Sequence, residues 1–348
     1  MKHWAAASIA WLALGACGGP DPEAGDPASA LVLYSSLAET ETRALSEAYT
    51  AATGTPVNYM LDAADVLIDK MAARAHRPEA DLLLVAGTRP LGRAVDEDVL
   101  RPAPAGTAFD AIPPGLRDGE RYWIGLAADS LAIVYRPARV GQANIDSYAA
   151  LGGDTLRGQL CLPGSEAESS RSLVAALLAG LGSRDAEFAV RGWMTNLARP
   201  PLAGDRELLQ ALESGACGIA VVGSAALARH LDANPGSTLI VSWPGDAVVG
   251  PQLHLLAAGI SRHANDPGAA ADMLEWLAGP EGQRVLAELG PYQTARPASR
   301  TPDMLERHGL DKPPGPGPAV PSASSLGAAD VVRLLERSRY GSGVTATN

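Results

Sequence analysis

The strongest constraint on the fold is a regular alternation of strand-like and helix-like segments near the start of the chain. Residues 30–36 and 80–87 are short apolar runs of strand length, and residues 56–60 form another. Residues 40–53 and 63–75 lie between them and carry apolar side chains at helical spacing. This strand–helix–strand–helix–strand order predicts a parallel sheet covered by helices.

A second unit of the same kind follows after a long extended segment, which we expect to cross between two lobes. The expected strands of this part are 122–135, 159–162, 218–222, 237–243 and 251–260, the last being a return crossing. The expected helices are 169–181, 185–197, 206–214, 225–231, 266–277, 279–289 and 327–338. Two α/β lobes joined by more than one crossing strand predict a hinged clamp, which suits binding of a small solute.

The expected division of the chain combines these strands and helices with the character of the two chain ends, which is described below. It comprises a signal peptide at 1–16, a flexible tether at 17–29, lobe 1 at 30–130 plus 250–300, lobe 2 at 131–249 plus 301–340, and a disordered tail at 341–348.

The first residues indicate export. Lys2 and His3 precede an apolar run at 4–14, which has the length of a signal peptide and is too short to span a membrane. The run closes with LGAC, which resembles a bacterial lipobox and implies that Cys17 is acylated as the mature N-terminus. The alternative is an ordinary cleaved signal with an incidental cysteine.

Charge narrows the classes of partner. The chain has 28 Lys and Arg against 39 Asp and Glu, a formal net charge of −11. Nucleic-acid recognition needs a basic surface, so we expect no nucleic-acid partner.

The chain has three cysteines, and an exported protein can form disulfides between them. Acylation of Cys17 leaves Cys161 and Cys217, each in a short apolar strand-like run. In an oxidising envelope the two could form a disulfide, and the alternative is two buried free thiols.

Several stretches, taken in order, resemble one family. They are LVLYSS, ADLLLV, NLARPPLAGDRELLQALESGACGIAVV and GISRHANDPGAAADMLEWLAGPEGQ, spread over about residues 30–340. The chain resembles periplasmic solute-binding proteins of ABC importers, in the ferric-iron-binding branch. The resemblance implies an α/β fold of the periplasmic-binding-protein type II, with two lobes, a hinge and a cleft.

The same resemblance implies a function and a place of work. It implies a monomeric, non-enzymatic protein without a cofactor that binds a small-molecule or ion ligand and serves ABC permease subunits. It places the protein on the periplasmic or extracytoplasmic face, held to the membrane by a lipid anchor. Cys161 and Cys217 match positions that are paired in some relatives.

The iron ligands of the family do not carry over. Its adjacent tyrosine pair falls at Ala225-Ala226, its His-Tyr pair near Ala38-Glu39, and a further tyrosine near Ser169. None of the eight tyrosines is adjacent to another. We therefore expect that iron binding through tyrosinates is lost and that the chain has no metal site.

Three serine-rich loops, each before a helix, are the candidate ligand site. The residues are Ser35, Ser36, Glu39, Ser165, Ser169, Arg171 and Ser224. Hydroxyls combined with the free amides of helix N-termini can hold an anion, so we expect a small oxyanion such as a phosphonate, phosphate or carboxylate. The alternative is that these serines only cap helices and that Arg171 lies on a solvated helix face.

Other functions remain open at this point. Glu39, Glu166 and His254 could hold iron(III) or an iron chelate without tyrosines, and a regulatory or interaction lipoprotein of the envelope is a second alternative. The turn at Gly223-Ser224 superficially resembles the nucleophile elbow of serine hydrolases. The glycines that the elbow requires are absent, so catalysis is the weakest alternative.

Overall fold

The computed structural model describes residues 30–73, 79–245, 248–295, 303–311 and 328–341. Cys17, the expected signal peptide and the tether lie outside these residues, as do residues 342–348 of the expected tail. Among the helices of the described residues, none has both the length and the apolar character needed to cross a bilayer.

Lobe 1 begins with three parallel strands separated by helices. Leu33 of the central strand pairs with Tyr59 on one side and with Leu82 on the other. The elements are β1 (Leu31–Ser35), α1 (Glu39–Thr53), β2 (Val57–Leu61), α2 (Ala64–Ala73), β3 (Leu82–Ala86) and α3 (Thr88–Asp96). The expected strand–helix alternation is therefore confirmed, and α3 is an additional helix.

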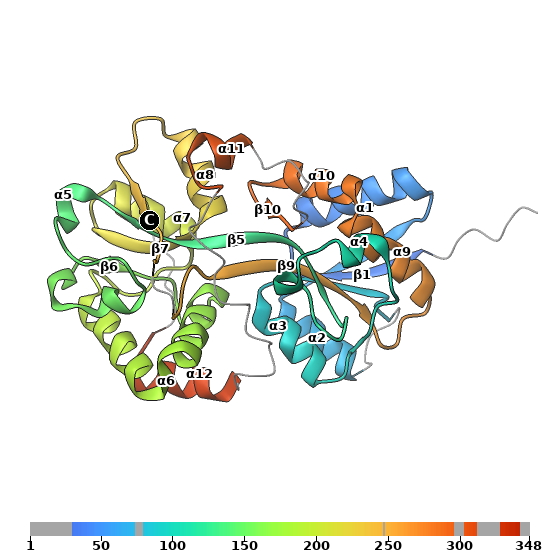
Figure 1. Cartoon of the computed structure of the whole chain (residues 1–348), viewed down its shortest axis with the longest axis horizontal. Coiled ribbons are helices and arrows are strands. Elements are labelled where there is room, and N and C mark those ends of the chain that lie inside the picture. Colours follow the sequence, from blue (N-terminus) through green and yellow to red (C-terminus); the bar gives the residue numbers. More distant parts are fainter. Residues whose placement is uncertain (1–29, 74–78, 246–247, 296–302, 312–327, 342–348) are drawn as a thin grey trace, which may run out of the picture.

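Two long antiparallel strands join the lobes. They are β5 (Ile124–Tyr135) and β9 (Leu253–Ser261). The first part of β5 pairs with β9, and its second part pairs with strands of the other lobe, so β5 belongs to both (Figure 1). The whole sheet runs in the order β2-β1-β3-β9-β5-β7-β6.

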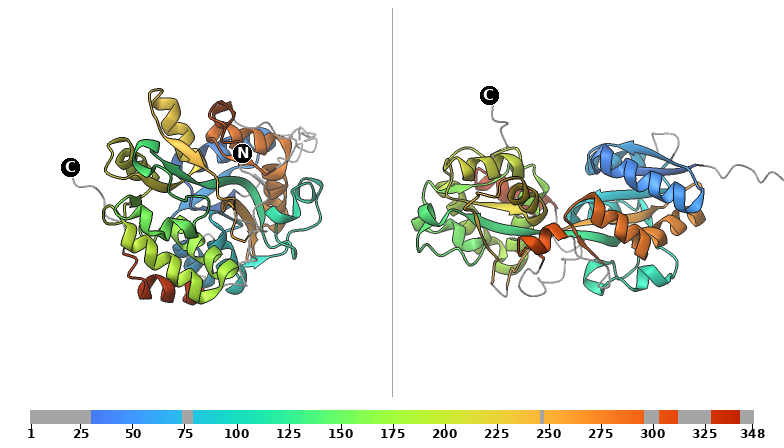
Figure 2. Two further views of the ribbon diagram at one scale, coloured as in Figure 1. Left: turned by 60° about the vertical axis from the view of Figure 1, so that its left-hand side comes forward. Right: turned by 90° about the horizontal axis from the view of Figure 1, so that it is seen from above.

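Lobe 2 is a second α/β unit around β5. Its elements are α5 (Pro137–Val140), β6 (Leu160–Cys161), α6 (Glu168–Asn196), α7 (Asp205–Glu213), β7 (Ile219–Gly223), α8 (Ser224–Ala233), β8 (Ile240–Ser242), α11 (Asp303–Arg307) and α12 (Ala328–Arg337). Lobe 1 is completed by β4 (Leu100–Arg101), α4 (Thr107–Asp110), α9 (Pro267–Ala278), α10 (Pro280–Leu289) and β10 (Gln293–Thr294). Seen from above, the two lobes lie apart and are joined by a narrow waist (Figure 2).

The buried apolar residues form four clusters, two in each lobe. The clusters of lobe 1 draw on residues 31–128 and 255–295, and those of lobe 2 on residues 131–249 and 305–340. Each lobe therefore buries its own core on both faces of its part of the sheet.

Other helical regions also differ in detail from the sequence prediction. The two helices expected at 169–181 and 185–197 form the long α6, which is broken by left-handed Gly182 (φ 78°). The segment 101–115, rich in Pro and Ala, contains the short helix α4.

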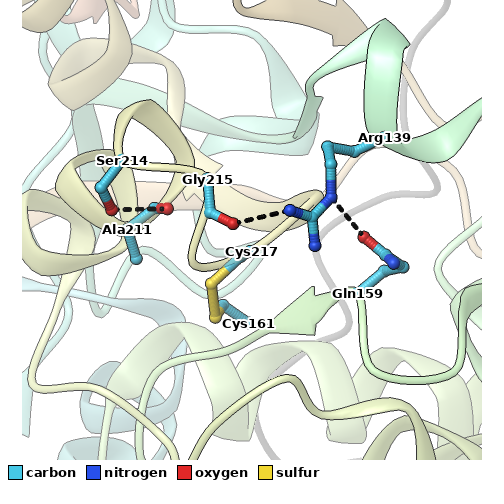
Figure 3. The surroundings of a disulfide bond; sticks show 7 residues. All are labelled: Arg139, Gln159, Cys161, Ala211, Ser214, Gly215 and Cys217. Atoms are coloured by element: carbon cyan, nitrogen blue, oxygen red, sulfur yellow. Dashed lines mark hydrogen bonds between the residues drawn. A yellow bond between two sulfur atoms is a disulfide. The ribbon is translucent and has the colours of Figure 1, made fainter.

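The disulfide between Cys161 and Cys217 is confirmed. The two Cα atoms are 5.9 Å apart, and both residues are buried. The bond links the end of β6 to the segment before β7, close to Arg139, which donates to the Gly215 carbonyl (2.9 Å) and to Gln159 Oε1 (3.3 Å) (Figure 3). The disulfide therefore links the edge strand of the lobe 2 sheet, β6, to the segment that precedes β7.

Candidate functional site

The N-terminus of α8 is occupied by a carboxylate of the protein itself. Asp129 of β5 accepts hydrogen bonds at Oδ1 from the Ser224 hydroxyl (2.7 Å) and from the Ala225 amide (2.8 Å). Ser224 is 1% exposed, and its Oγ also accepts from the Ser130 amide (3.2 Å). The Ser224 hydroxyl and the Ala225 amide thus bind an internal anion and do not face a ligand.

A second carboxylate lies beside the first. Asp205, at the start of α7, accepts from the Gly223 amide at Oδ2 (3.0 Å). A Cβ on Gly223 would collide with Asp129 Oδ2 and would lie 3.1 Å from Asp205 Oδ2, so a larger residue would force the two carboxyls to shift. We call Asp129, Asp205 and the turn between them, Gly223 to Ala225, the acidic corner.

Burial in the acidic corner makes ionisation of both carboxyls less favourable. Burial raises the pKa of Asp129 and raises that of Asp205 to about 6, and the negative charge of Asp129 adds to the second effect. His254, the neighbour of Asp129 across the two crossing strands, and Arg229 oppose these shifts without cancelling them. As whole residues Asp129 and Asp205 are half-buried.

One chain of contacts connects the acidic corner to the first turn of α1. Arg229 of α8 lies over the ring of Tyr292, with 6.0 Å between its Cζ and the ring centroid. The Tyr292 hydroxyl donates to Glu41 Oε1 (3.3 Å), and burial raises its pKa to about 12. Residues from both lobes thus meet at this point.

A second contact between the lobes lies at the N-terminus of α6. Glu168, the first residue of α6, pairs with Arg89 of α3 at 3.0 Å, and its Cγ would be 2.7 Å from a Cβ on Gly87. We call Arg89, Glu168 and the Gly87 turn the interlobe bridge.

The expected loop at α1 is only partly available to a ligand. The Ser35 hydroxyl is fully buried, bonds with that of Thr42 (2.8 Å), and accepts from the Leu37 amide (3.2 Å). Ser36 is half-buried, and its Oγ accepts from the Ala86 amide (3.1 Å), next to the interlobe bridge. Glu39 is exposed and lies 3.9 Å from Arg43.

The loop before α6 has more polar side chains that remain partly exposed than the loop at α1 has. Ser165, Ser169 and Arg171 are all half-buried, and Arg171 Nε donates to the Ser165 carbonyl (3.2 Å). The Ser169 hydroxyl has no partner among the described residues. The N-cap residue of α6 is Ala167, which provides no side-chain cap. This helix therefore presents uncapped amides beside the interlobe bridge.

The tyrosines are spread along the chain. They lie in different elements, and burial raises the pKa of Tyr34, Tyr49, Tyr148, Tyr292 and Tyr340, which favours the phenol over the phenolate. Across the described ranges, no three His, Cys, Asp or Glu side chains are grouped so that they could hold a metal ion. Ala225, where the relatives' tyrosine pair begins, is 1% exposed.

Sequence reasoning missed Asp129, Asp205, Arg89 and Arg229. Asp129 had a signal, because it is the only charged residue in the apolar run 122–135. Arg89 follows directly on the Gly87 turn at the end of β3, where open α/β folds hold ligands.

Comparison with known proteins gives consistent matches. The family model described as "Bacterial extracellular solute-binding protein" matches residues 44–310. Iron uptake protein A1 of Synechocystis is 26% identical over 262 residues, 74% of this chain and 73% of that protein.

Solved structures with the same fold include two with different ligands. The Trichodesmium protein IdiA (FutA), in complex with iron and citrate, has a TM-score of 0.80 and 24% identity, covering 90% of this chain and 100% of that one. The periplasmic binding protein AfuA of Actinobacillus pleuropneumoniae, with fructose-6-phosphate bound, has a TM-score of 0.68 and 14% identity, covering 88% and 97%.

Proposed function

Because this chain belongs to the bacterial extracellular solute-binding proteins, in the ferric-iron-binding branch that serves ABC transporters, we propose that it delivers a small oxyanion to an ABC permease. The cargo would be a phosphate, phosphonate or carboxylate held between the lobes, and closure around it would be the signal to the permease. The protein would act as a monomer.

The observation that carries this proposal is the uncapped N-terminus of α6 beside a fixed arginine. Ser169, Arg171 and the first amides of α6 are donors on lobe 2, while Arg89 is a donor on lobe 1. We retain Ser36, Ser165, Ser169 and Arg171 as ligand contacts. Ser35 and Ser224 support the loops from inside, since their hydroxyls are already bonded within the protein.

Two solved structures of the same fold hold ligands with oxyanion groups. The AfuA structure holds a sugar phosphate, and the Trichodesmium structure holds iron with citrate, which is itself a carboxylate. Both likenesses are below 25% identity and therefore bear on the fold alone.

Iron as a chelate is the second candidate, because the acidic corner offers hard oxygen donors. Asp129 Oδ2 and Asp205 Oδ1 have no hydrogen-bond partner among the described residues. We retain this candidate only without tyrosinate ligation, because burial favours the phenol form of the five tyrosines whose pKa is raised.

A hydrolase receives no support from the geometry of Ser224. Its hydroxyl donates directly to Asp129, and Nε2 of the neighbouring His254 has no hydrogen-bond partner among the described residues. A serine nucleophile needs an imidazole as its immediate partner, which is not the arrangement here.

The test is a thermal-shift and calorimetric comparison of phosphate, methylphosphonate and acetate with ferric citrate. We expect stabilisation by at least one iron-free anion. Stabilisation by ferric citrate alone would replace the oxyanion with an iron chelate. A visible charge-transfer band in the iron-loaded protein would show tyrosinate ligation and contradict the mapping to Ala225-Ala226.

We also propose that the chain is anchored through acylated Cys17. Mass spectrometry of the mature protein from membranes should find a lipid on an N-terminal Cys17. Cleavage at another position, with an unmodified Cys17, would leave a free periplasmic protein.

A further inference from the structure

The interlobe bridge places a carboxylate of lobe 2 on a cationic group of lobe 1. Arg89 Nε donates to Glu168 Oε2 at 3.0 Å, and the two side chains are only 23% and 21% exposed. The pair joins the first turns of α3 and α6, which belong to different lobes.

Arg89 is held rigidly on its own lobe. Asp65 of α2 accepts from both Nη atoms, at 3.1 and 2.8 Å, in an end-on bidentate pair. Burial alone would lower the pKa of Arg89, but the bonds to Asp65 and Glu168 outweigh it and raise that pKa. A guanidinium has five N–H groups in a fixed plane, so the edge that carries Nε remains directed toward lobe 2.

Glu168 is held from the other side. The Ser172 hydroxyl donates to its Oε1 (3.2 Å), and its Cγ lies against Gly87. Gly87 has φ 107° and no Cβ, so the turn after β3 leaves room for this side chain. An anionic group from one lobe is therefore bound at the carboxyl end of a strand of the other, where open α/β folds bind ligand anions.

We infer that Arg89 is the receptor for the oxyanion of the cargo and that Glu168 occupies it while the cargo is absent. The inference rests on the proposed function and names the residue that would select the anion. A cargo oxyanion takes the place of the Glu168 carboxylate on the Nε edge, and Glu168 turns to solvent. Arg89 keeps one anionic partner on that edge throughout, so the exchange leaves no unpaired buried cation.

Competition by Glu168 also sets the affinity. The interlobe bridge pairs one residue of each lobe, and the cargo must displace this internal ligand of Arg89 before it binds. Removing the charge of Glu168 should therefore tighten anion binding and should also open the cargo-free protein.

The experiment compares Glu168→Gln with Arg89→Gln by titration calorimetry at low salt, with phosphate, methylphosphonate and acetate as probes. Glutamine keeps the shape and the Ser172 bond of Glu168. We expect about two- to fivefold tighter binding by Glu168→Gln, from the range of part-exposed ion pairs. Arg89→Gln should weaken binding about tenfold or more, as expected for a charge-assisted pair.

Two controls separate this effect from general changes of charge. Glu187→Gln removes a carboxylate farther along α6 that pairs with Arg191 and Arg337 within lobe 2. Arg93→Gln removes the neighbouring arginine of α3, which pairs with Asp65, Asp69 and Glu97 of lobe 1. Both should leave anion affinity within about twofold.

The outcomes distinguish the inference from the proposed function. If anions bind the wild type and Glu168→Gln binds them equally or more weakly, the competition is wrong while the proposed function stands. If only ferric citrate binds the wild type, the proposed cargo is wrong. Failure of iron-free anions to bind Glu168→Gln overturns the receptor role in either case. Small-angle scattering adds a ligand-free readout, since Glu168→Gln should increase the radius of gyration, and an unchanged value would contradict the bridge.

Discussion

Replacing Asp205 by Asn should stabilise the protein at neutral pH. Asp205 Oδ2 accepts from the Gly223 amide, and burial together with Asp129 raises the pKa of Asp205 to about 6. Asparagine retains an oxygen that can accept the same hydrogen bond, while the charge is removed. The substitution therefore isolates the cost of ionising this carboxyl inside the folded protein.

The size of the effect follows from the pKa. A rise from the ordinary value of 3.8 to about 6 corresponds, at 1.36 kcal/mol per pH unit, to about 3 kcal/mol. The folded state binds this proton more tightly than the unfolded state does. The stabilisation is thus complete below pH 3.8 and is lost as the pH rises through about 6. Loss of a favourable charge at the start of α7 offsets about 0.3–1 kcal/mol, which leaves a gain of about 2 kcal/mol at pH 7.5.

The assay is urea unfolding of wild type and Asp205→Asn between pH 4 and pH 8, followed by tryptophan fluorescence. The gain should be small at pH 4, where Asp205 is protonated in the wild type, should grow as the pH rises to about 6, and should stay constant above that. Glu47→Gln, an exposed position within α1, is the control and should show no such dependence. A variant that is less stable at pH 7.5, or a difference that is constant with pH, would refute the reasoning.

Two further predictions concern the stability of the folded protein. One concerns the disulfide of lobe 2, and the other concerns the buried hydroxyl of Tyr148. Reducing the Cys161–Cys217 disulfide, or replacing both cysteines by Ala, should lower the free energy of unfolding by about 2–4 kcal/mol, and equal melting temperatures of oxidised and reduced protein would contradict this. Tyr148→Phe should cost about 1–3 kcal/mol in denaturant unfolding, because the buried hydroxyl donates to the Leu131 carbonyl (2.7 Å) and accepts from the Gln252 amide (3.1 Å). An unchanged midpoint would mean that water replaces both bonds.

The sequence was sufficient for most of the fold because the decisive signals are local. The apolar periodicity of residues 30–87 predicted the order of β1 to β3 and the two helices between them. Helix α3 was missed because Pro90 and Gly92 weaken its pattern. Proline is tolerated in the first turn of a helix, where its missing N–H has no intrahelical partner to lose.

The candidate site was predictable only in part, because its bonds join distant segments. The sequence placed Ser224 correctly at the start of a helix. The Ser224 hydroxyl donates to the carboxylate of Asp129, which is 95 residues away in the sequence. Only the tertiary structure brings Ser224 and Asp129 together. The pair of Arg89 with Glu168 spans 79 residues in the same way.

The position of β9 makes the lobe 1 sheet depend on a segment that lies late in the chain. This strand lies between β3 and β5 in the sheet, although it is made long after both. Until residue 261 has emerged, the growing chain has no partner for the inner edge of β3, and the two halves of the lobe 1 sheet stay separate. A chain truncated before residue 253 would lack β9 and would expose the inner edge of β3 and the lobe 1 part of β5 to its neighbours.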